Sequence, residues 1–244
     1  MLWNEGKWNR DLCRRKGELL RKLLGLIFDF DGLIVDTETA RYYAWKEVIE
    51  SHGVPLPLSV WHENIGLPSE AFDPLEFLKQ KAKMPVDAEA VRKRKNEVFW
   101  SRMEGESLLP GVREYLEEAR RRKMKLAICS SSPRKWIVEN VARWGIEDFF
   151  DEVVTGSDVT KIKPDPELYL RVLEVLNLSA ENCIAFEDSP KGVESAKAAG
   201  IFCVAVPNSI TEESNLEGAD IQLGSLAEMP LAELEKRFRN ARRG

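Results

Sequence analysis

The sequence predicts an α/β protein with a doubly wound parallel-sheet core and a small all-helical domain inserted into it. Three observations support this fold class. Short apolar runs bounded by turn-forming residues recur along the chain, as is typical of buried strands. Amphipathic stretches alternate with these runs, which favours a parallel sheet covered by helices on both faces. One long segment, 40–107, has helical periodicity without a convincing strand, which indicates the insertion.

The chain begins with a basic N-terminal extension at residues 1–25. Its leucine spacing predicts an amphipathic helix, carried by Leu12, Leu19, Leu20, Leu23 and Leu24. Acidic residues interrupt the segment and no apolar core with a cleavage site follows, so it does not resemble a signal peptide. A helix that binds a membrane surface or a partner is one interpretation. We favour the other, a dispensable extension docked on the body.

Five strands and the helices between them form the predicted core domain, residues 26–39 and 108–244. The first strand starts at Leu26 and runs directly into two aspartates. The other strands are expected in 126–132, 152–156, 182–188 and 202–206. The helices are expected to start at Pro110, Pro133, Asp165 and Pro190. Ligands of such sheets bind beyond the carboxyl ends of the strands, so polar residues there are candidate functional residues.

The inserted domain, 40–107, contains three stretches with helical periodicity, which start at Ala40, Phe72 and Asp87. A helical domain hinged into a loop at the catalytic edge of a sheet is well placed to act as a lid. The basic cluster at 92–95 has acidic neighbours, which favours a solvated helix face over a nucleic-acid-binding patch.

Composition and charge exclude two classes of function. The 244-residue chain has no apolar run near the roughly 18 to 20 residues of a membrane span, which excludes integral membrane functions. Its net charge is −5, but residues 1–25 carry +4 and residues 236–244 carry +5, which leaves −14 for the body between them. Nucleic-acid binders usually place a basic stripe on the folded body, so DNA or RNA binding is disfavoured.

The four cysteines are too few and too widely spaced for a disulfide framework or a zinc site. Cys129, Cys183 and Cys203 lie in apolar runs, which predicts small reduced core residues and a reducing compartment. The expected location is therefore the cytoplasm. His52 and His62 are the only histidines, so a histidine-rich metal site or a Ser-His-Asp triad has little support.

Two carboxylates, Asp29 and Asp31, follow the first strand and precede Gly32. Both lie near a low-dielectric core, so their charge requires compensation. Clusters of oxygen ligands without His or Cys suit Mg²⁺, and Glu187 and Asp188 at the end of another strand complete such a site. Gly32 lets the backbone bend so that both aspartates face one pocket. One carboxylate can then act as nucleophile and the other as general acid and base.

Two further polar residues fit the same chemistry. Ser130 ends the second strand, and Lys163 precedes a proline just ahead of a helix. A hydroxyl and an ammonium group that converge on the aspartates would hold a dianionic phosphoryl group. Each residue alone is common in proteins, but the order along the chain of the aspartates, the serine, the lysine and the acidic pair favours one shared site.

This order of motifs resembles the haloacid dehalogenase superfamily of phosphatases. The resemblance covers about Leu26 to Leu234 and rests on four motifs: DFDGLIVDTE, LAICSSS, KPDPELY and FEDSPKGVESAKAAG. It implies the Rossmann-like core of that superfamily. The insertion looks like the small helical cap of the beta-phosphoglucomutase and phosphoglycolate phosphatase subgroup.

The resemblance also implies a role for each candidate residue in the hydrolysis of a phosphomonoester. Asp29 would be the nucleophile that forms an aspartyl-phosphate. Asp31 would protonate the leaving alcohol and then activate water. Ser130, Ser131 and Lys163 would bind the phosphoryl oxygens.

The same resemblance implies a Mg²⁺ cofactor. Its ligands would be the Asp29 carboxylate, the Asp31 backbone carbonyl and Asp188, with Glu187 bound directly or through water. The expected partner is a small phosphorylated metabolite such as a sugar phosphate. A monomer is possible, because a cap can close the site without a second subunit.

Three alternative functions fit this sequence less well. The dehalogenase branch lacks the second aspartate of the first motif, so Asp31 argues against it. A beta-phosphoglucomutase is closer, but its phosphosugar-binding His and Arg match Arg41 and the loop 65–72, which has no Arg. A non-catalytic binding protein of the same fold is disfavoured because every motif residue is intact. Candidates for recognising the leaving group are Trp45, Trp61, His62 and Glu63.

Overall fold

A computed structural model describes residues 22–62 and 72–241 of the chain. Most of the predicted N-terminal helix, including Leu12, Leu19 and Leu20, lies outside these residues. The helix prediction is wrong for Leu23 and Leu24, which have irregular backbone. The Leu24 backbone instead donates to the Asn182 carbonyl and accepts from the Lys125 N–H, both at 2.8 Å. These bonds fix the segment in line with the first strand.

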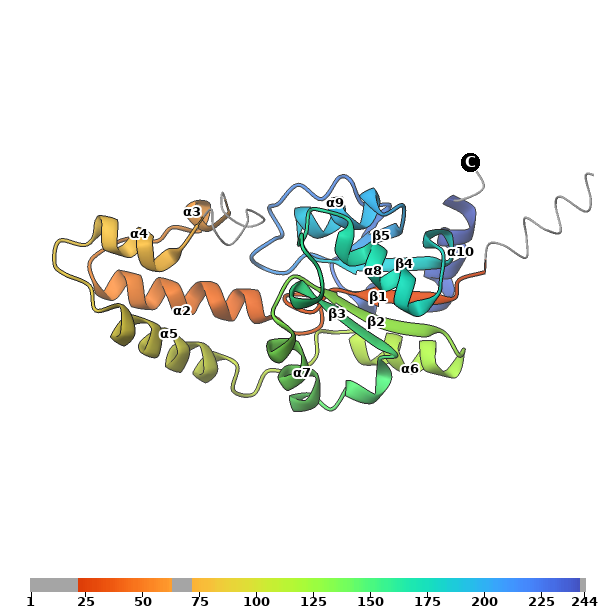
Figure 1. The fold of residues 1–244 in the computed structure, drawn as a ribbon, viewed down its shortest axis with the longest axis horizontal. Coiled ribbons are helices and arrows are strands. Elements are labelled where there is room, and N and C mark those ends of the chain that lie inside the picture. The colour runs from red at the N-terminus through yellow and green to blue at the C-terminus, as the bar shows by residue number, and fades with distance from the viewer. Residues whose placement is uncertain (1–21, 63–71, 242–244) are drawn as a thin grey trace, which may run out of the picture.

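The core is a six-stranded sheet in which every pairing is parallel, as predicted. Its strands are β1 (Gly25–Phe28), β2 (Lys125–Ser130), β3 (Glu152–Thr155), β4 (Cys183–Glu187), β5 (Phe202–Ala205) and β6 (Ile221–Gln222). The order β3-β2-β1-β4-β5-β6 means that the chain builds one side of the sheet outward from β1 and then crosses to the other side (Figure 1). The edge beyond β1 and β4 is therefore a topological switch point, where such sheets bind ligands.

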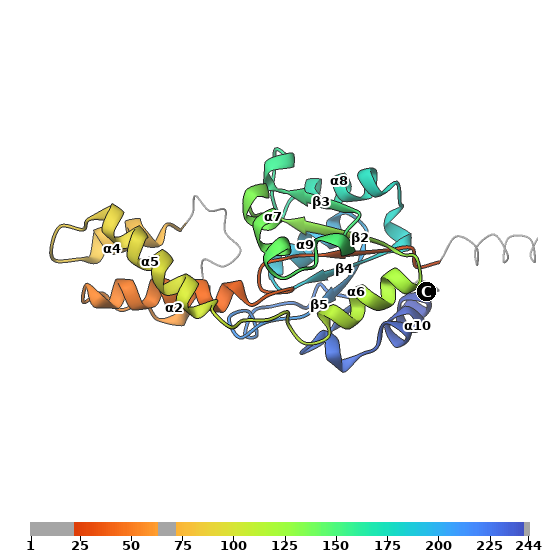
Figure 2. The ribbon, with the colours of Figure 1, turned by 90° about the horizontal axis from the view of Figure 1, so that it is seen from below.

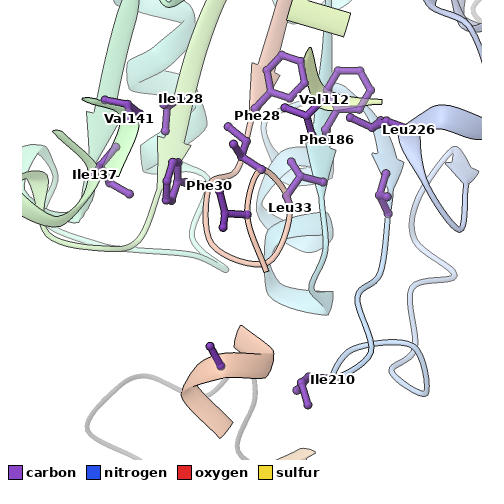
Figure 3. Close-up of a cluster of buried hydrophobic side chains, with 14 of the residues drawn as sticks. Phe28, Phe30, Leu33, Val112, Ile128, Ile137, Val141, Phe186, Ile210 and Leu226 are labelled. Carbon is purple, nitrogen blue, oxygen red and sulfur yellow. The ribbon is translucent and has the colours of Figure 1, made fainter. Parts of the chain in front are cut away.

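Helices cover both faces of this sheet (Figure 2). One face packs against α6 (Val112–Arg121), α7 (Arg134–Arg143) and α10 (Leu231–Ala241), and the other against α8 (Glu167–Leu176) and α9 (Pro190–Ala198). Side chains alternate across β1, because Leu26 and Phe28 join the first core cluster and Ile27 joins the second. Figure 3 shows part of the first cluster, in which the rings of Phe28 and Phe186 stack with centroids 4.7 Å apart.

The segment between β1 and α6 is helical, as predicted, and extends to one side of the sheet (Figures 1 and 2). It contains α2 (Thr37–Ser51), α3 (Leu58–His62), α4 (Pro74–Lys81) and α5 (Ala88–Arg102), and α2 packs along α5. Asp36, Asp73 and Asp87 cap α2, α4 and α5 by accepting hydrogen bonds from first-turn N–H groups. Since Asp36 starts α2, the helix begins three residues before the expected insertion.

Several elements differ from the sequence expectations. The apolar run 126–132 extends past the second strand, which ends at Ser130 as predicted, so Ser131 and Ser132 leave the sheet as a loop. The sequence analysis missed β6, which is only two residues long, and the short helix α3. No helix was predicted over Leu231–Ala241, where the structure has α10.

Cys129, Cys183 and Cys203 are buried in β2, β4 and β5 and are unpaired, as predicted. Arg94, in the basic cluster 92–95, is exposed and pairs with Glu47, in agreement with a solvated helix face. In the part of the chain that the structure describes, no helix is long and apolar enough to cross a membrane.

Candidate active site

The structure brings the predicted site residues together at one edge of the sheet. Asp29 and Asp31 follow β1, Ser130 ends β2, and Glu187 and Asp188 lie at the end of β4. This convergence follows from the register, since Phe28 pairs with Ile128 on one side and with Phe186 on the other. All five side chains, together with Lys163 from the loop before α8, belong to residues that are at most 8% exposed.

Gly32 forms the bend that the sequence predicted. Its φ is +79°, a left-handed conformation that favours glycine. A Cβ atom at this position would lie 2.3 Å from Oδ2 of Asp188, so only glycine permits this approach. Asn208 reinforces the junction, because its Nδ2 donates to the Gly32 carbonyl at 3.2 Å and to Asp188 Oδ2 at 2.8 Å.

Lys163 lies among the buried carboxylates. Its Nζ is 2.9 Å from Asp29 Oδ1 and 2.6 Å from Glu187 Oε1, and it donates to the Cys129 carbonyl at 2.8 Å. Burial by itself would lower the pKa of Lys163, but the carboxylates of Asp29 and Glu187 outweigh it and raise that pKa above its ordinary value. The ammonium group is therefore charged and carries three hydrogen bonds, as many as it can donate.

The negative charges of the buried carboxylates are less fully neutralised than the positive charge of Lys163. Burial raises the pKa of Glu187 to about 7, although Lys163 opposes the shift. Burial and the neighbouring charges of Asp29 and Glu187 raise the pKa of Asp188 well above its ordinary value. Burial also raises the pKa of Asp29, against the opposing effect of Lys163. The site therefore has an excess of buried negative charge that a cation would stabilise.

Two observations show that the residues fit a divalent metal ion. Among the described residues, Asp29, Glu187 and Asp188 each offer an oxygen within 4.8 Å of the others. Tyr169 donates to Glu187 Oε1, which also pairs with Lys163, while the buried Oε2 has no hydrogen-bond partner in the described structure. A donor set made of oxygens alone suits a hard cation such as Mg²⁺.

The Asp31 carboxylate has a different environment from these three. Its Oδ1 accepts hydrogen bonds from Thr37 Oγ1 at 2.7 Å and from Trp136 Nε1 at 2.9 Å. Its Oδ2 accepts from Ser132 Oγ at 2.5 Å, and Arg41 Nη2 lies 3.7 Å from Oδ1. The carboxylate is thus held by donors and lies outside the three-residue ligand group. The expected metal contact through the Asp31 backbone carbonyl stays a prediction.

Sequence reasoning missed Thr37, Ser132 and Trp136 as partners of Asp31. Thr37 and Ser132 lie inside the quoted motifs, so a search of those motifs for hydroxyl donors could have found them. Trp136 belongs to an ordinary amphipathic helix, and nothing in the sequence marks it.

A cleft of 690 Å³ opens above these groups. Ser130 and Ser131 both line it, and Ser130 Oγ accepts a hydrogen bond from the Ser132 N–H at 3.1 Å. The inserted helices supply part of the opposite wall, through Glu38, Arg41, Trp45, Trp61 and Phe72.

Two of the four leaving-group candidates, Trp45 and Trp61, therefore line the cleft. Glu63 and most of the loop 65–72 lie outside the described residues, and the structure describes only the backbone of His62. Arg41, the position compared with the mutase histidine, pairs with Glu38 through Nη1 at 2.5 Å.

Comparison with known proteins assigns the family. The model of haloacid dehalogenase-like hydrolases matches residues 26–206. YhcW of Bacillus subtilis (strain 168) is 44% identical over 207 residues, which cover 85% of this chain and 94% of YhcW. The phosphorylated carbohydrates phosphatase of Thermotoga maritima is 40% identical over 178 residues, which cover 72% of this chain and 81% of that protein.

A solved structure gives the same result. The beta-phosphoglucomutase of Clostridium difficile has a TM-score of 0.71 at 25% identity, with 91% of this chain and 100% of that chain covered. The chain belongs to the haloacid dehalogenase-like hydrolase family. The predicted resemblance is confirmed, and so is the prediction of a hydrolytic enzyme of the phosphatase type.

Proposed function

We propose that the protein is a Mg²⁺-dependent phosphatase that hydrolyses small phosphorylated carbohydrates through an aspartyl-phosphate intermediate. The observation that carries the proposal is the convergence of Asp29, Asp31, Ser130 and Lys163 on one cleft. The Thermotoga maritima relative, named for its action on phosphorylated carbohydrates, supports the substrate class.

The two aspartates divide the hydrolysis into two displacements. A carboxylate oxygen of Asp29 attacks phosphorus, the bond from phosphorus to the ester oxygen breaks, and Asp31 gives its proton to the leaving alcohol. Asp31, now a carboxylate, takes a proton from water as that water attacks the phosphoaspartate. Inorganic phosphate leaves and Asp29 is restored. Each displacement thus uses a positioned nucleophile and a general acid or base.

The other groups bind charge and orient the substrate. Ser130, Ser131 and Lys163 bind the phosphoryl oxygens. Lys163 contributes a positive charge beside Asp29, and one of its three hydrogen bonds to the protein gives way to the bond with the phosphoryl group. When Mg²⁺ is bound, Asp29, Asp188 and the Asp31 carbonyl would hold it, with Glu187 as a direct or water-mediated ligand. The ion would neutralise charge on the transferring phosphoryl group, which is the larger part of catalysis in this chemistry.

The helical insertion, residues 40–107, acts in this proposal as a cap on the core, residues 26–39 and 108–244. It supplies aromatic side chains, Trp45, Trp61 and Phe72, to the cleft wall. A wall of aromatic rings with a few polar groups suits a small organic ligand such as a sugar ring. The buried, unpaired cysteines support a reducing, cytoplasmic location, and a cap that closes the site within one chain permits a monomer.

The test is phosphate release from a panel of hexose phosphates, pentose phosphates, phosphoglycolate and nucleoside monophosphates, with Mg²⁺ or with EDTA. Asp29→Asn serves as the contamination control. We expect metal-dependent release by the wild type alone, with sugar phosphates preferred. Isomerisation of beta-glucose 1-phosphate without phosphate release would identify a mutase instead. No turnover of any ester would identify a binding protein.

A further inference from the structure

Trp136 contacts the Asp31 carboxylate from a helix that carries none of the predicted site residues. It lies on α7, and its indole Nε1 donates to Asp31 Oδ1 at 2.9 Å. An indole N–H donates and never accepts, so Oδ1 of Asp31 is the acceptor in this contact. A tryptophan that served only to fill space would not need its N–H directed at a carboxylate.

Thr37 contacts the same oxygen from another direction. Its hydroxyl donates to Asp31 Oδ1 at 2.7 Å, while Ser132 donates to Oδ2 at 2.5 Å. Three elements therefore hold the Asp31 carboxylate: the start of α2, the loop after β2, and α7. Two donors therefore bind Oδ1, and only Ser132 binds Oδ2 among these three contacts.

The ring of Trp136 packs against the inserted helices. Its centroid lies 5.8 Å from that of Phe99 and 5.8 Å from that of Trp100, both on α5. The Arg143 guanidinium, at the end of α7 in the core domain, lies 4.3 Å from the Trp100 ring centroid and is a second contact between α7 and α5. The N–H of Trp136 thus holds Asp31 while its ring contacts the last helix of the insertion.

The chain passes between the core and the insertion at two points, and each is linked to Asp31. At the first, Thr37 begins α2 and binds Asp31 directly. At the second, α5 ends at Arg102, and its last turns contact Asp31 through Trp136. A displacement of the insertion would therefore act on the Asp31 carboxylate at both points.

We propose that Trp136 is a positioning residue that fixes the orientation of Asp31 and makes it depend on the placement of the inserted helices. The inference rests on the proposed function, in which Asp31 protonates the leaving alcohol. A misoriented acid slows departure of an alkoxide, which needs that proton. It affects p-nitrophenolate much less, because this group leaves as an anion.

The main test is Trp136→Phe, which keeps an aromatic ring against Phe99 and Trp100 but removes the N–H. The measured quantity is kcat/KM for p-nitrophenyl phosphate and for the hexose phosphate that the wild type hydrolyses best. The value of kcat/KM depends only on the steps up to release of the leaving group. Hydrolysis of the phosphoaspartate therefore does not affect it. We expect a fall of about tenfold or more with the hexose phosphate and of less than about threefold with p-nitrophenyl phosphate.

Two further variants separate positioning from packing. Trp100→Leu leaves Trp136 and its N–H in place and tests the link to the insertion. We expect a smaller loss of kcat/KM than in Trp136→Phe, and again a larger loss with the hexose phosphate than with p-nitrophenyl phosphate. Trp144→Phe is the matched control, because the N–H of this tryptophan donates to the Glu106 carbonyl and not to Asp31, and phenylalanine keeps an aromatic ring beside Phe30, whose ring centroid lies 6.4 Å from that of Trp144. Its ratio of the two kcat/KM values should equal that of the wild type.

The outcomes separate this inference from the function on which it rests. A wild-type protein that hydrolyses no ester contradicts both. An active wild type with equal losses on the two substrates in Trp136→Phe, or with no loss, contradicts the role of Trp136 alone. An unchanged ratio in Trp100→Leu contradicts the link to the inserted helices.

Discussion

Lys163 is surrounded by buried negative charge and is held by Asp29, Glu187 and a backbone carbonyl. Removal of one partner from a buried ion pair leaves uncompensated charge. We therefore expect Lys163→Ala to lower the free energy of unfolding by about 3–5 kcal/mol, measured by chemical denaturation in EDTA. Lys161→Ala is the control, because this lysine is exposed. Equal free energies of unfolding for the two variants would contradict the placement of Lys163.

Glu187 gives the site a pH dependence of stability. Its pKa is raised to about 7 by burial, so between pH 4.5 and 7 the folded chain holds a proton that the unfolded chain releases. Without divalent cations, the free energy of unfolding should therefore fall as the pH rises through this range. Asp29 and Asp188 shift in the same direction and add to the effect.

Denaturation curves in EDTA at several pH values measure this dependence. Glu187→Gln should make the curve of stability against pH shallower, because it removes one of the three titrating groups. Saturating Mg²⁺ should also reduce the slope, since a bound cation favours the charged carboxylates. Stability that rises from pH 5 to pH 7 in EDTA would contradict the account of these carboxylates.

Residue by residue, the candidate site divides into two groups. Asp29, Asp31, Ser130, Lys163, Glu187 and Asp188 could be predicted, because strand ends in a parallel sheet share an edge and the motifs mark the residues. Thr37 and Ser132 could be proposed from the motifs as hydroxyl donors, whereas Trp136 could not, and the contact of all three with Asp31 depends on the direction of their side chains. That direction follows from three-dimensional packing, which spacing along the chain does not encode.

At the scale of elements, α9 lies directly against the site. A Cβ atom at Gly192, in the first turn of α9, would lie 1.7 Å from Glu187 Oε2. In most helices Gly→Ala is stabilising by about 1 kcal/mol. Here we expect Gly192→Ala to destabilise the protein and to raise the Mg²⁺ concentration needed for half-maximal activity, because Glu187 must move away from its Lys163 and Tyr169 contacts.

A Mg²⁺ titration of activity, with thermal melting alongside, measures both effects. Gly218→Ala is a suitable control, because the nearest atom to its Cβ, in Val193, would be at the ordinary contact distance of 3.4 Å. If Gly192→Ala has the same Mg²⁺ requirement and melting temperature as the control, α9 does not pack closely against Glu187 and this prediction is contradicted.

Elements with strong apolar patterns could be predicted, whereas a very short strand and a helix rich in charged residues could not. The first five strands are mostly buried runs, and all five lie within two residues of the expected positions. β6 is too short to show a period. In α10 three apolar residues have helical spacing and face the core: Leu231, Leu234 and Phe238. Charged residues fill most of the positions between them, so the apolar pattern is weak.

At the scale of the whole molecule, the fold places the reactive carboxylates where two bodies of structure meet. The sheet supplies Asp29 and Asp31 at the topological switch point, and the inserted helices extend from that side of the core (Figure 1). The inserted segment supplies the aromatic part of the cleft wall. One of the two chain crossings between these bodies, at Thr37, lies six residues after Asp31. The central claim of the account is that Asp29 forms a covalent bond to phosphorus in this cleft.

Trapping the phosphorylated enzyme tests that claim most directly. The Asp31→Asn variant, mixed with p-nitrophenyl phosphate and Mg²⁺ and quenched in acid, is digested and its peptides are analysed by mass spectrometry. The account predicts one phosphoryl group on the peptide that contains Asp29, because the leaving group needs no acid while hydrolysis of the intermediate lacks its base. A phosphoryl group on another residue, or release of p-nitrophenol with no phosphorylated peptide, would contradict it.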